Sequence, residues 1–226
     1  GVCMHAPLER PAVVESSRDG QFEAIARLAF EAAYVVPVLV IAQSSQEAAD
    51  LVEILRRHVG RFRGCHGRDA LPELRGDLIR LLSQRLYETS HQEYKDNLNA
   101  ATRPIVHTRS GREERTWRIT VTDPTGGRGN DYQMADEGVD SFGGFMVVMS
   151  HIPLSKRDWV QFKGRTARQK WRGQYCAVLN AEEQVGLRPD GMGEVQLDGE
   201  LELHTNAPCP CKRRCKLSEA VALQSG

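Results

Sequence analysis

Several features are scarce or missing in this 226-residue sequence, and each absence narrows the class of protein it can encode. Its 30 basic residues balance its 30 acidic residues, so we expect no overall attraction to nucleic acid or to anionic membranes. The longest apolar stretch, at 32–42, is far too short to cross a bilayer, and no secretory signal pattern is present. The six cysteines do not form a disulfide framework for a chain of this size, which favours a reducing compartment.

No Gly-Lys dipeptide occurs anywhere in the sequence, which excludes a nucleotide-binding P-loop of the Walker type. The chain begins with Gly1 rather than Met, as a fragment or a processed product would. What the sequence does contain is a hydrophobic fraction of 40%, which is sufficient for a core. The length suits one domain with an extension, or two small domains.

Residues 21–180 alternate between amphipathic segments and short apolar runs, which predicts an α/β domain. A helix is expected at 21–33, followed by an apolar run at 38–42 that is typical of a strand buried on both faces. Ser44 is a predicted N-cap, and Glu47 completes a capping box for the helix that follows. This order of strand, tight turn and helix indicates a parallel sheet with flanking helices.

The rest of the chain gives weaker local signals. Leucines at helical spacing predict a helical insertion, whereas 102–116 is polar and is expected to be a surface connection. The further segments that we expect are a linker at 1–20, the helical insertion at 60–97, strands at 117–122, 145–150 and 174–180, a helix at 155–170, and an extension at 181–226. This extension is expected to hold a hairpin near Asp198 and an irregular, mostly disordered C-terminal tail at 204–226.

One stretch, 161–169, carries two arginines three residues apart, Arg165 and Arg168. On a helix such a pair lies on one face, so both guanidinium groups can reach a common target. The planar guanidinium fork suits phosphate oxygens. The alternative is an ordinary solvated basic helix, because other lysines and arginines surround the pair.

A glycine-rich loop, Gly126-Gly-Arg-Gly129, follows the strand predicted at 117–122. Open α/β sheets place ligands at the carboxyl ends of their strands, and glycines let backbone N–H groups approach an anion. Taken alone, such a loop is equally consistent with a simple turn. The acidic pair Asp136-Glu137 follows no apolar strand and is expected to lie in a loop.

The order and spacing of these segments resemble the second RecA-like domain of superfamily 2 helicase-type ATPases, in particular SecA, the preprotein translocase motor. The resemblance extends from about Pro11 to Asn180, without gaps from Asn99 onward. Residues 38–45 are similar to helicase motif IV, and Gly127-Arg-Gly-Asn-Asp131 is similar to motif V. The residues that match motif VI are Ser155, Arg157, Gln161, Gly164, Arg165, Arg168 and Gln169; further matches are Ala24-Ile25, Leu98-Asn99-Ala100, the pair Gly143-Gly144, and Gly173.

The resemblance implies that ATP with magnesium is held mainly by the P-loop of a first RecA-like domain, on which this domain closes. Arg165 and Arg168 would then be motif VI arginines, one of them a finger on the γ-phosphate, and Gln161 would orient that face. Gly127, Arg128 and Gly129 would shape the nucleotide-facing loop, and Asp131 would lie near the ribose or the coupling network. The chain alone would hydrolyse ATP poorly or not at all.

A SecA-like role also implies a preprotein and a membrane channel as partners, and a location in the cytoplasm or an organelle stroma, peripheral to a membrane. Two other functions stay open. The chain could be part of an RNA or DNA helicase, with Arg109, Arg112 and Arg115 lining a nucleic-acid track, or a non-catalytic interaction module with a RecA-like fold. The intact arginine pair counts against the module, since a scaffold does not need it.

The sequence departs from the family pattern in three places. Ala167 replaces the second glycine of motif VI, Asn130 replaces a motif V threonine, and the 60–95 segment replaces a shorter connection. The tail Pro208-Cys-Pro-Cys211 resembles the start of a zinc-binding SecA tail. Its candidate ligands, Cys209, Cys211 and Cys215 with His204, are spaced too closely for a tetrahedral site, so no metal centre is predicted.

Overall fold

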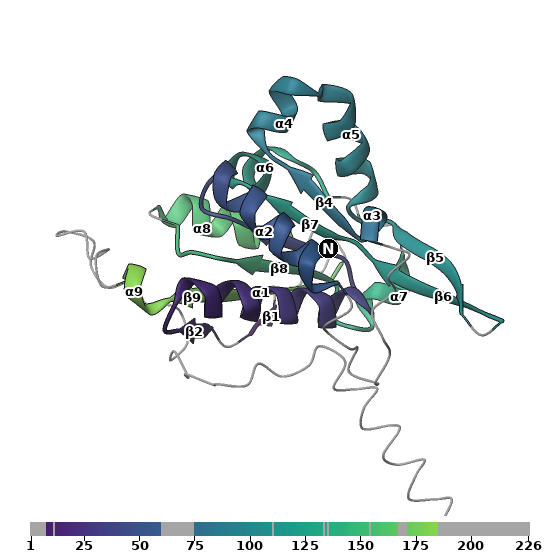
Figure 1. Ribbon diagram of the computed structural model, residues 1–226. Helices are drawn as coiled ribbons and strands as arrows, with labels where there is room; N and C mark the ends of the chain where they lie inside the picture. The colour runs from purple at the N-terminus through teal and green to yellow at the C-terminus, as the bar shows by residue number, and fades with distance from the viewer. Residues whose placement is uncertain are drawn as a thin grey trace, which may run out of the picture.

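A parallel sheet forms the centre of the protein, as Figure 1 shows for the computed structural model. The structure describes residues 8–10, 12–59, 75–109, 111–132, 134, 136–153, 155–166 and 171–184. The strand order is β1-β9-β8-β3-β7-β4, with β2 also paired to β9, and every pairing is parallel. These strands are β1 (Leu8–Glu9), β2 (Val13–Glu15), β3 (Val38–Ile41), β4 (Ile79–Leu82), β7 (Ile119–Thr122), β8 (Phe145–Met149) and β9 (Gly173–Asn180).

Helices connect these strands and flank the sheet, so the predicted α/β class with flanking helices is confirmed. A separate antiparallel hairpin, β5 (Pro104–Arg109) with β6 (Arg112–Trp117), projects beyond the amino end of β7. The helices are α1 (Arg18–Ala33), α2 (Ser45–His58), α3 (Arg75–Leu78), α4 (Gln84–Thr89), α5 (His91–Ala100), α6 (Pro124–Gly129), α7 (Glu137–Asp140), α8 (Lys156–Lys163) and α9 (Ala181–Gln184).

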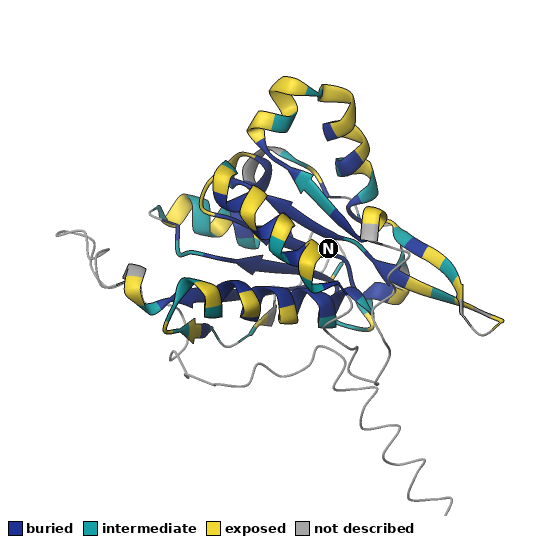
Figure 2. Cartoon of the chain, in the orientation of Figure 1, coloured by how far each residue is buried: buried dark blue, intermediate teal, exposed yellow. Residues whose placement is uncertain are grey.

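Strand β3 shows why the sheet needs a cover on both faces. Its side chains alternate: Val38 and Val40 belong to the apolar cluster that contains the buried residues of α1 and α2. Leu39 and Ile41 belong to the opposite cluster, with Phe162 of α8. All of these strand side chains are fully buried, and each contributes about 1.5–3 kcal/mol by leaving water. Figure 2 shows the same pattern as dark-blue strands between helices with exposed outer faces.

Side-chain caps begin the first two long helices. The Ser17 hydroxyl accepts a hydrogen bond from the Gly20 N–H at 3.1 Å, so α1 begins at Arg18 rather than at the predicted residue 21. The predicted cap at Ser44 is confirmed, because its hydroxyl accepts from the Glu47 N–H at 3.2 Å. The Glu47 carboxylate does not complete a capping box; it forms an ion pair with Arg18 at 3.2 Å instead.

The prediction of a helical insertion at 60–97 is wrong for part of this range. It contains β4, an edge strand of the main sheet that pairs with β7, followed by the separate helices α4 and α5. Four residues are too few for apolar periodicity to separate a strand from a helix, and the neighbouring leucines at helical spacing obscured it. The 60–74 part of the expected insertion lies outside the described residues.

Two more segments expected to be irregular contain strands. Within the predicted linker 1–20, β1 and β2 both pair with β9, and α1 has already begun at Arg18. The polar connection predicted at 102–116 folds into the β5–β6 hairpin, anchored at its base by the buried residues Ile105 and Trp117. The extension predicted at 181–226 begins with the short helix α9, and everything beyond Gln184 is outside the described structure.

Candidate functional site

Four helices begin with side-chain caps at the carboxyl edge of the sheet. The capping residues are Ser44 for α2, Ser83 for α4, Asp123 for α6 and Ser155 for α8. Such an edge gathers helix N-termini and the loops that follow the strands, and it is where open α/β sheets bind ligands. The segments that resemble motifs IV, V and VI therefore meet at one end of the molecule.

The Asp123 carboxylate joins three of these segments. Its Oδ2 accepts a hydrogen bond from the Ser45 hydroxyl at 2.5 Å and one from the Gln84 N–H at 2.8 Å. Its Oδ1 accepts from the N–H groups of Thr125 and Gly126 at 3.0 and 3.2 Å. Asp123 is buried, so this one side chain fixes the starts of α2, α4 and α6 relative to one another. The sequence analysis did not single it out, although an Asp-Pro pair after an apolar strand is a helix-start signal.

The glycines of the motif V segment serve packing more than ligand approach. They lie in α6, where the N–H of Gly127 donates to the Asp123 carbonyl at 3.0 Å. A Cβ on Gly126 would stand 1.9 Å from Thr122 Oγ1, and one on Gly127 would stand 3.0 Å from the Phe162 ring. The expected open loop is thus a short, close-packed helix in which these N–H groups are used internally.

Asn130 connects this helix to the motif VI segment. Its backbone carbonyl accepts a hydrogen bond from Arg165 Nη1 at 2.6 Å. Its side-chain amide donates to the Tyr94 hydroxyl at 2.7 Å and to the Gly126 carbonyl at 3.2 Å. Asn130 was noted in the sequence only as a departure from the motif V threonine, and these contacts make it the centre of the site.

The helix that precedes Arg165 ends sooner than predicted. Ser155 caps α8 through the Asp158 N–H at 3.0 Å, so the helix begins near the predicted residue, but α8 stops at Lys163 with Gly164 as its C-cap. Arg165 follows in a turn, where its N–H donates to the Phe162 carbonyl at 3.1 Å. The helix predicted at 155–170 therefore ends before Arg165. Arg168 lies outside the described residues, so the shared face of Arg165 and Arg168 stays a prediction.

The remaining predicted site residues fall in three groups. Gln161 is partly buried in α8, and Asp131 is exposed just after Asn130. Arg128 and Gly129 are the last residues of α6, and nothing of the Arg128 side chain is described. Arg168 lies outside the described residues, as do His204, Cys209, Cys211 and Cys215.

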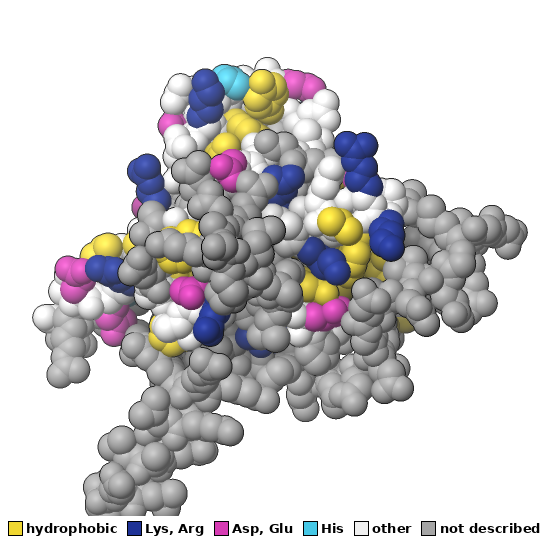
Figure 3. Space-filling model, turned by 180° about the vertical axis from the view of Figure 1, so that it is seen from behind, with side chains coloured by type: hydrophobic (Ala, Val, Ile, Leu, Met, Phe, Trp, Pro, Cys, Tyr) yellow, Lys and Arg dark blue, Asp and Glu magenta, His cyan; other side chains and the backbone are white. Residues whose placement is uncertain are grey.

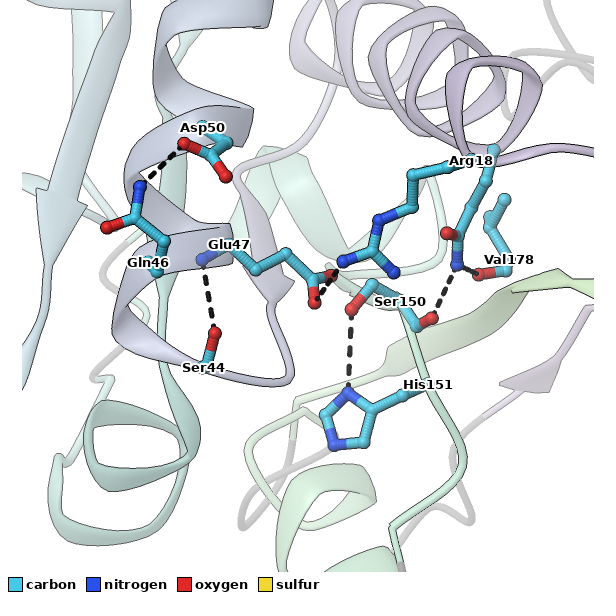
Figure 4. Close-up of polar contacts among 9 residues, drawn as sticks. Arg18, Ser44, Gln46, Glu47, Asp50, Ser150, His151 and Val178 are labelled. Carbon is cyan, nitrogen blue, oxygen red and sulfur yellow. Dashed lines mark hydrogen bonds and ion pairs between the residues drawn. The ribbon is translucent and has the colours of Figure 1, made fainter. Parts of the chain in front are cut away.

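A second polar cluster, which the sequence analysis missed, lies at the same edge beside α1 (Figure 4). The amide of Gln21 is fully buried and donates to the carbonyls of Ser150 and Val178 at 2.6 and 2.8 Å, which ties α1 to the ends of β8 and β9. Next to it, His151 packs edge-on against the Phe162 ring at 6.2 Å. Burial lowers the pKa of His151 to about 4, against a smaller opposing effect of Asp158, so the imidazole is neutral at physiological pH.

Two further features are absent from the described residues of the protein. Among them, no group of three or more His, Cys, Asp and Glu side chains is placed to hold a metal ion. In the same part of the chain, no helix combines the length and the apolar character that crossing a membrane requires.

Comparison with known proteins gives a fold likeness only. No protein-family model matches the sequence, and no curated protein matches it significantly. A variant of S. cerevisiae Dbp5 bound to Gle1 and IP6 matches with a TM-score of 0.49 and 14% identity. The match covers 79% of this chain and 37% of the Dbp5 chain. The C-terminal domain of the DEAD-box protein Dbp5 has a TM-score of 0.49 and 14% identity, with 82% of each chain covered.

A DEAD box protein from the hyperthermophile Methanococcus jannaschii has a TM-score of 0.47 and 21% identity, covering 82% of this chain and 39% of its own. This chain thus spans well under half the length of two of the three proteins. At these identities and TM-scores the likeness carries no argument about activity, ligand or partner. None of the three is a SecA protein, so the SecA resemblance of the sequence stays a prediction.

Proposed function

We propose that this chain is the second RecA-like domain of a helicase superfamily 2 ATPase, which closes on ATP held by the P-loop of another domain. The observation that carries the proposal is the 2.6 Å hydrogen bond between Arg165 and the carbonyl of Asn130. It joins the two segments that resemble motifs V and VI at the carboxyl edge of a parallel sheet. The two segments match separate motifs and are far apart in the sequence, and this contact brings them together as the proposed site requires.

In this role the arginines supply positive charge to the transferring phosphoryl group. A guanidinium offers five N–H donors in a rigid fork. In Arg165, one N–H on Nη1 donates to the backbone carbonyl of Asn130. Arg165 is 9% exposed, so its guanidinium is held by the domain rather than extended into solvent. Arg168 is proposed as the second arginine, with Gln161 orienting the same face and Asp131 near the ribose. A guanidinium suits a phosphate, and the P-loop domain would hold ATP and its magnesium ion.

The proposal is tested by steady-state ATP hydrolysis by this chain alone and by this chain together with a P-loop partner, which is first sought by capture with this chain as bait. The isolated chain should release no phosphate above background, and the two together should hydrolyse MgATP. Replacing Arg168 by Ala should reduce turnover by about three powers of ten or more while ATP binding is retained. Arg56→Ala is the matched control, because Arg56 is exposed on α2 and lies outside the segments that resemble the motifs. Robust hydrolysis by the isolated chain, or full activity of Arg168→Ala, would contradict the proposal.

Two substrates fit such a motor. A preprotein moved through a membrane channel is favoured by the SecA-like sequence of motifs V and VI. RNA or DNA is the alternative, and both kinds of polymer are tested side by side with a preprotein. A non-catalytic module is the third possibility, and the hydrolysis assay separates it from both motors.

The nucleic-acid track proposed for Arg109, Arg112 and Arg115 would lie along the β5–β6 hairpin. Arg109 and Arg112 pair at the end of the β5–β6 hairpin, beyond the amino end of β7 and away from the Asp123 edge. Arg115 is engaged in an ion pair with Asp136 at 3.2 Å. Labelled single-stranded RNA and an unfolded preprotein, titrated in parallel at two salt concentrations, distinguish the substrates, since phosphate contacts weaken steeply with salt.

A further inference from the structure

We propose that Tyr94, on α5, is a positioning residue for Arg165, acting through Asn130. The inference rests on the proposed function for its catalytic consequence, although the positioning itself is a property of this chain. Tyr94 lies in the range that the sequence analysis treated as an insertion of unknown purpose, so no motif points to it.

The contacts run in series from one helix to the other. The Tyr94 hydroxyl accepts a 2.7 Å hydrogen bond from the side-chain amide of Asn130, and the Asn130 carbonyl accepts one of 2.6 Å from Arg165. Because the amide and the carbonyl belong to one residue, fixing the side chain restricts the direction in which the backbone carbonyl points. The guanidinium that the carbonyl holds is restricted in turn.

The Asn130 side-chain amide donates to Tyr94 and to Gly126, and of these two acceptors Tyr94 is the one outside the α6 segment. The second hydrogen of the Asn130 amide goes to the Gly126 carbonyl at 3.2 Å, and the buried Tyr132 hydroxyl donates to that same carbonyl at 3.3 Å. Those two bonds join residues within the α6 segment and the chain just after it. The bond to Tyr94 holds it to α5, which is in turn fixed to the sheet edge by the Asn97 amide donating to the Leu81 carbonyl at 3.0 Å.

The surroundings of Tyr94 keep its hydroxyl in place. The residue is 8% exposed, and its ring packs edge-on against Tyr87 at 5.3 Å between centroids. Burial is the main cause that raises the pKa of Tyr94, so the hydroxyl stays protonated at neutral pH. Tyr87 itself is 50% exposed and also meets His91 edge-on at 4.5 Å. Figure 3 shows hydrophobic and histidine side chains together at the surface over α4 and α5.

The experiment removes one oxygen atom, in Tyr94→Phe, from the full 226-residue chain. The first readout is the Nη–H signal of Arg165, the group that donates to the Asn130 carbonyl, in ¹⁵N-edited spectra, assigned with Arg165→Lys. Tyr87→Phe is the matched control, because it removes a hydroxyl from the neighbouring ring of the same cluster. We expect Tyr94→Phe to speed solvent exchange at this N–H about tenfold, the change equivalent to losing one hydrogen bond, and Tyr87→Phe to leave it unchanged.

The second readout is hydrolysis with the P-loop domain, where Tyr94→Phe should lower kcat about tenfold at unchanged KM for ATP. The two readouts separate the two proposals. Unchanged exchange at Arg165 in a folded Tyr94→Phe chain overturns the positioning role, whatever the hydrolysis rate. A second outcome is faster exchange in Tyr94→Phe together with no ATP hydrolysis by the wild-type chain and the P-loop domain. That outcome supports the positioning role and overturns the proposed function. An equal effect of Tyr87→Phe on exchange also overturns the role, because it would show general loosening of the cluster.

Discussion

The backbone carbonyl of Asn130 holds the guanidinium of Arg165 at 2.6 Å, although the two residues are 35 positions apart in the chain. The bond links α6, which follows β7, to the turn after α8, which follows β8. A glycine in α6 makes the approach of these helices possible, because Gly127 lies directly under the ring of Phe162. Close packing and a charged hydrogen bond thus bring one arginine to the edge where the sheet can meet a second domain.

The Asp123 carboxylate should be one of the most sensitive polar positions in the fold. Asp123→Ala removes a buried carboxylate and leaves the donors of Ser45, Gln84 and the start of α6 without their acceptor, which should lower the free energy of unfolding by about 3 kcal/mol. Chemical denaturation monitored by circular dichroism measures the change. Asp50→Ala is the control, because Asp50 is exposed on α2 and should change stability by about 0.5 kcal/mol or less. A loss at Asp123 no larger than at Asp50 would contradict its role.

Gly126 should not tolerate a side chain. The Cβ of Gly126→Ala would overlap Thr122 Oγ1 at 1.9 Å, and the Thr122 hydroxyl is itself bonded to the Leu82 carbonyl at 2.7 Å. Relief of this overlap must separate α6 from β7 or break that bond, so we expect a loss of about 2–4 kcal/mol. Gly76→Ala tests the same change in α3, where a Cβ meets nothing within 4 Å, and it should be neutral or slightly stabilising. Equal melting temperatures for the two variants would refute the packing argument.

Much of the fold could be predicted from local sequence. The strand at Val38–Ile41, the Ser44 cap of the helix after it, and the strands at 145–149 and 173–180 follow from short apolar runs and a capping hydroxyl. Such signals depend on a few adjacent residues, and the buried parallel sheet strengthens them because its strands are apolar on both faces. The edge strand β4 was missed since it is short and lies among leucines at helical spacing.

The site could be predicted only in part, because its key contacts join distant segments. Motif resemblance indicated Gly127 and Arg165, but the partners of Asp123 lie 78 and 39 positions away in the chain, and no local pattern connects them. The contact of Tyr94 with Asn130 is of the same kind. The end of α8 was different: Gly164 is a local stop signal, and it was passed over in favour of a longer helix.

His151 should make stability depend on pH in mild acid. Its pKa lies at about 4 in the folded chain, below its ordinary value of 6.5, so the unfolded chain binds the proton more tightly. The resulting stabilisation, at most about 3 kcal/mol, is fully present above pH 6.5 and is lost as the pH falls from there toward 4. His151→Gln should flatten that part of the curve of unfolding free energy against pH, with His91→Gln as the exposed control. If the unfolding free energy of His151→Gln changed with pH as steeply as that of the wild type, the His151 imidazole would not be the source of the pH dependence.

The most direct test of the central claim is single-turnover hydrolysis of MgATP bound to the P-loop domain, measured with and without this chain. Wild-type chain should accelerate phosphate release, and Arg165→Lys, which keeps the charge but loses the guanidinium fork, should remove about three powers of ten of that acceleration. ATP affinity of the P-loop domain should be the same with either chain. If Arg165→Lys accelerated hydrolysis as well as wild type, the arginine held by Asn130 would not serve the phosphoryl group, and the account of this domain as the second half of an ATPase site would fail.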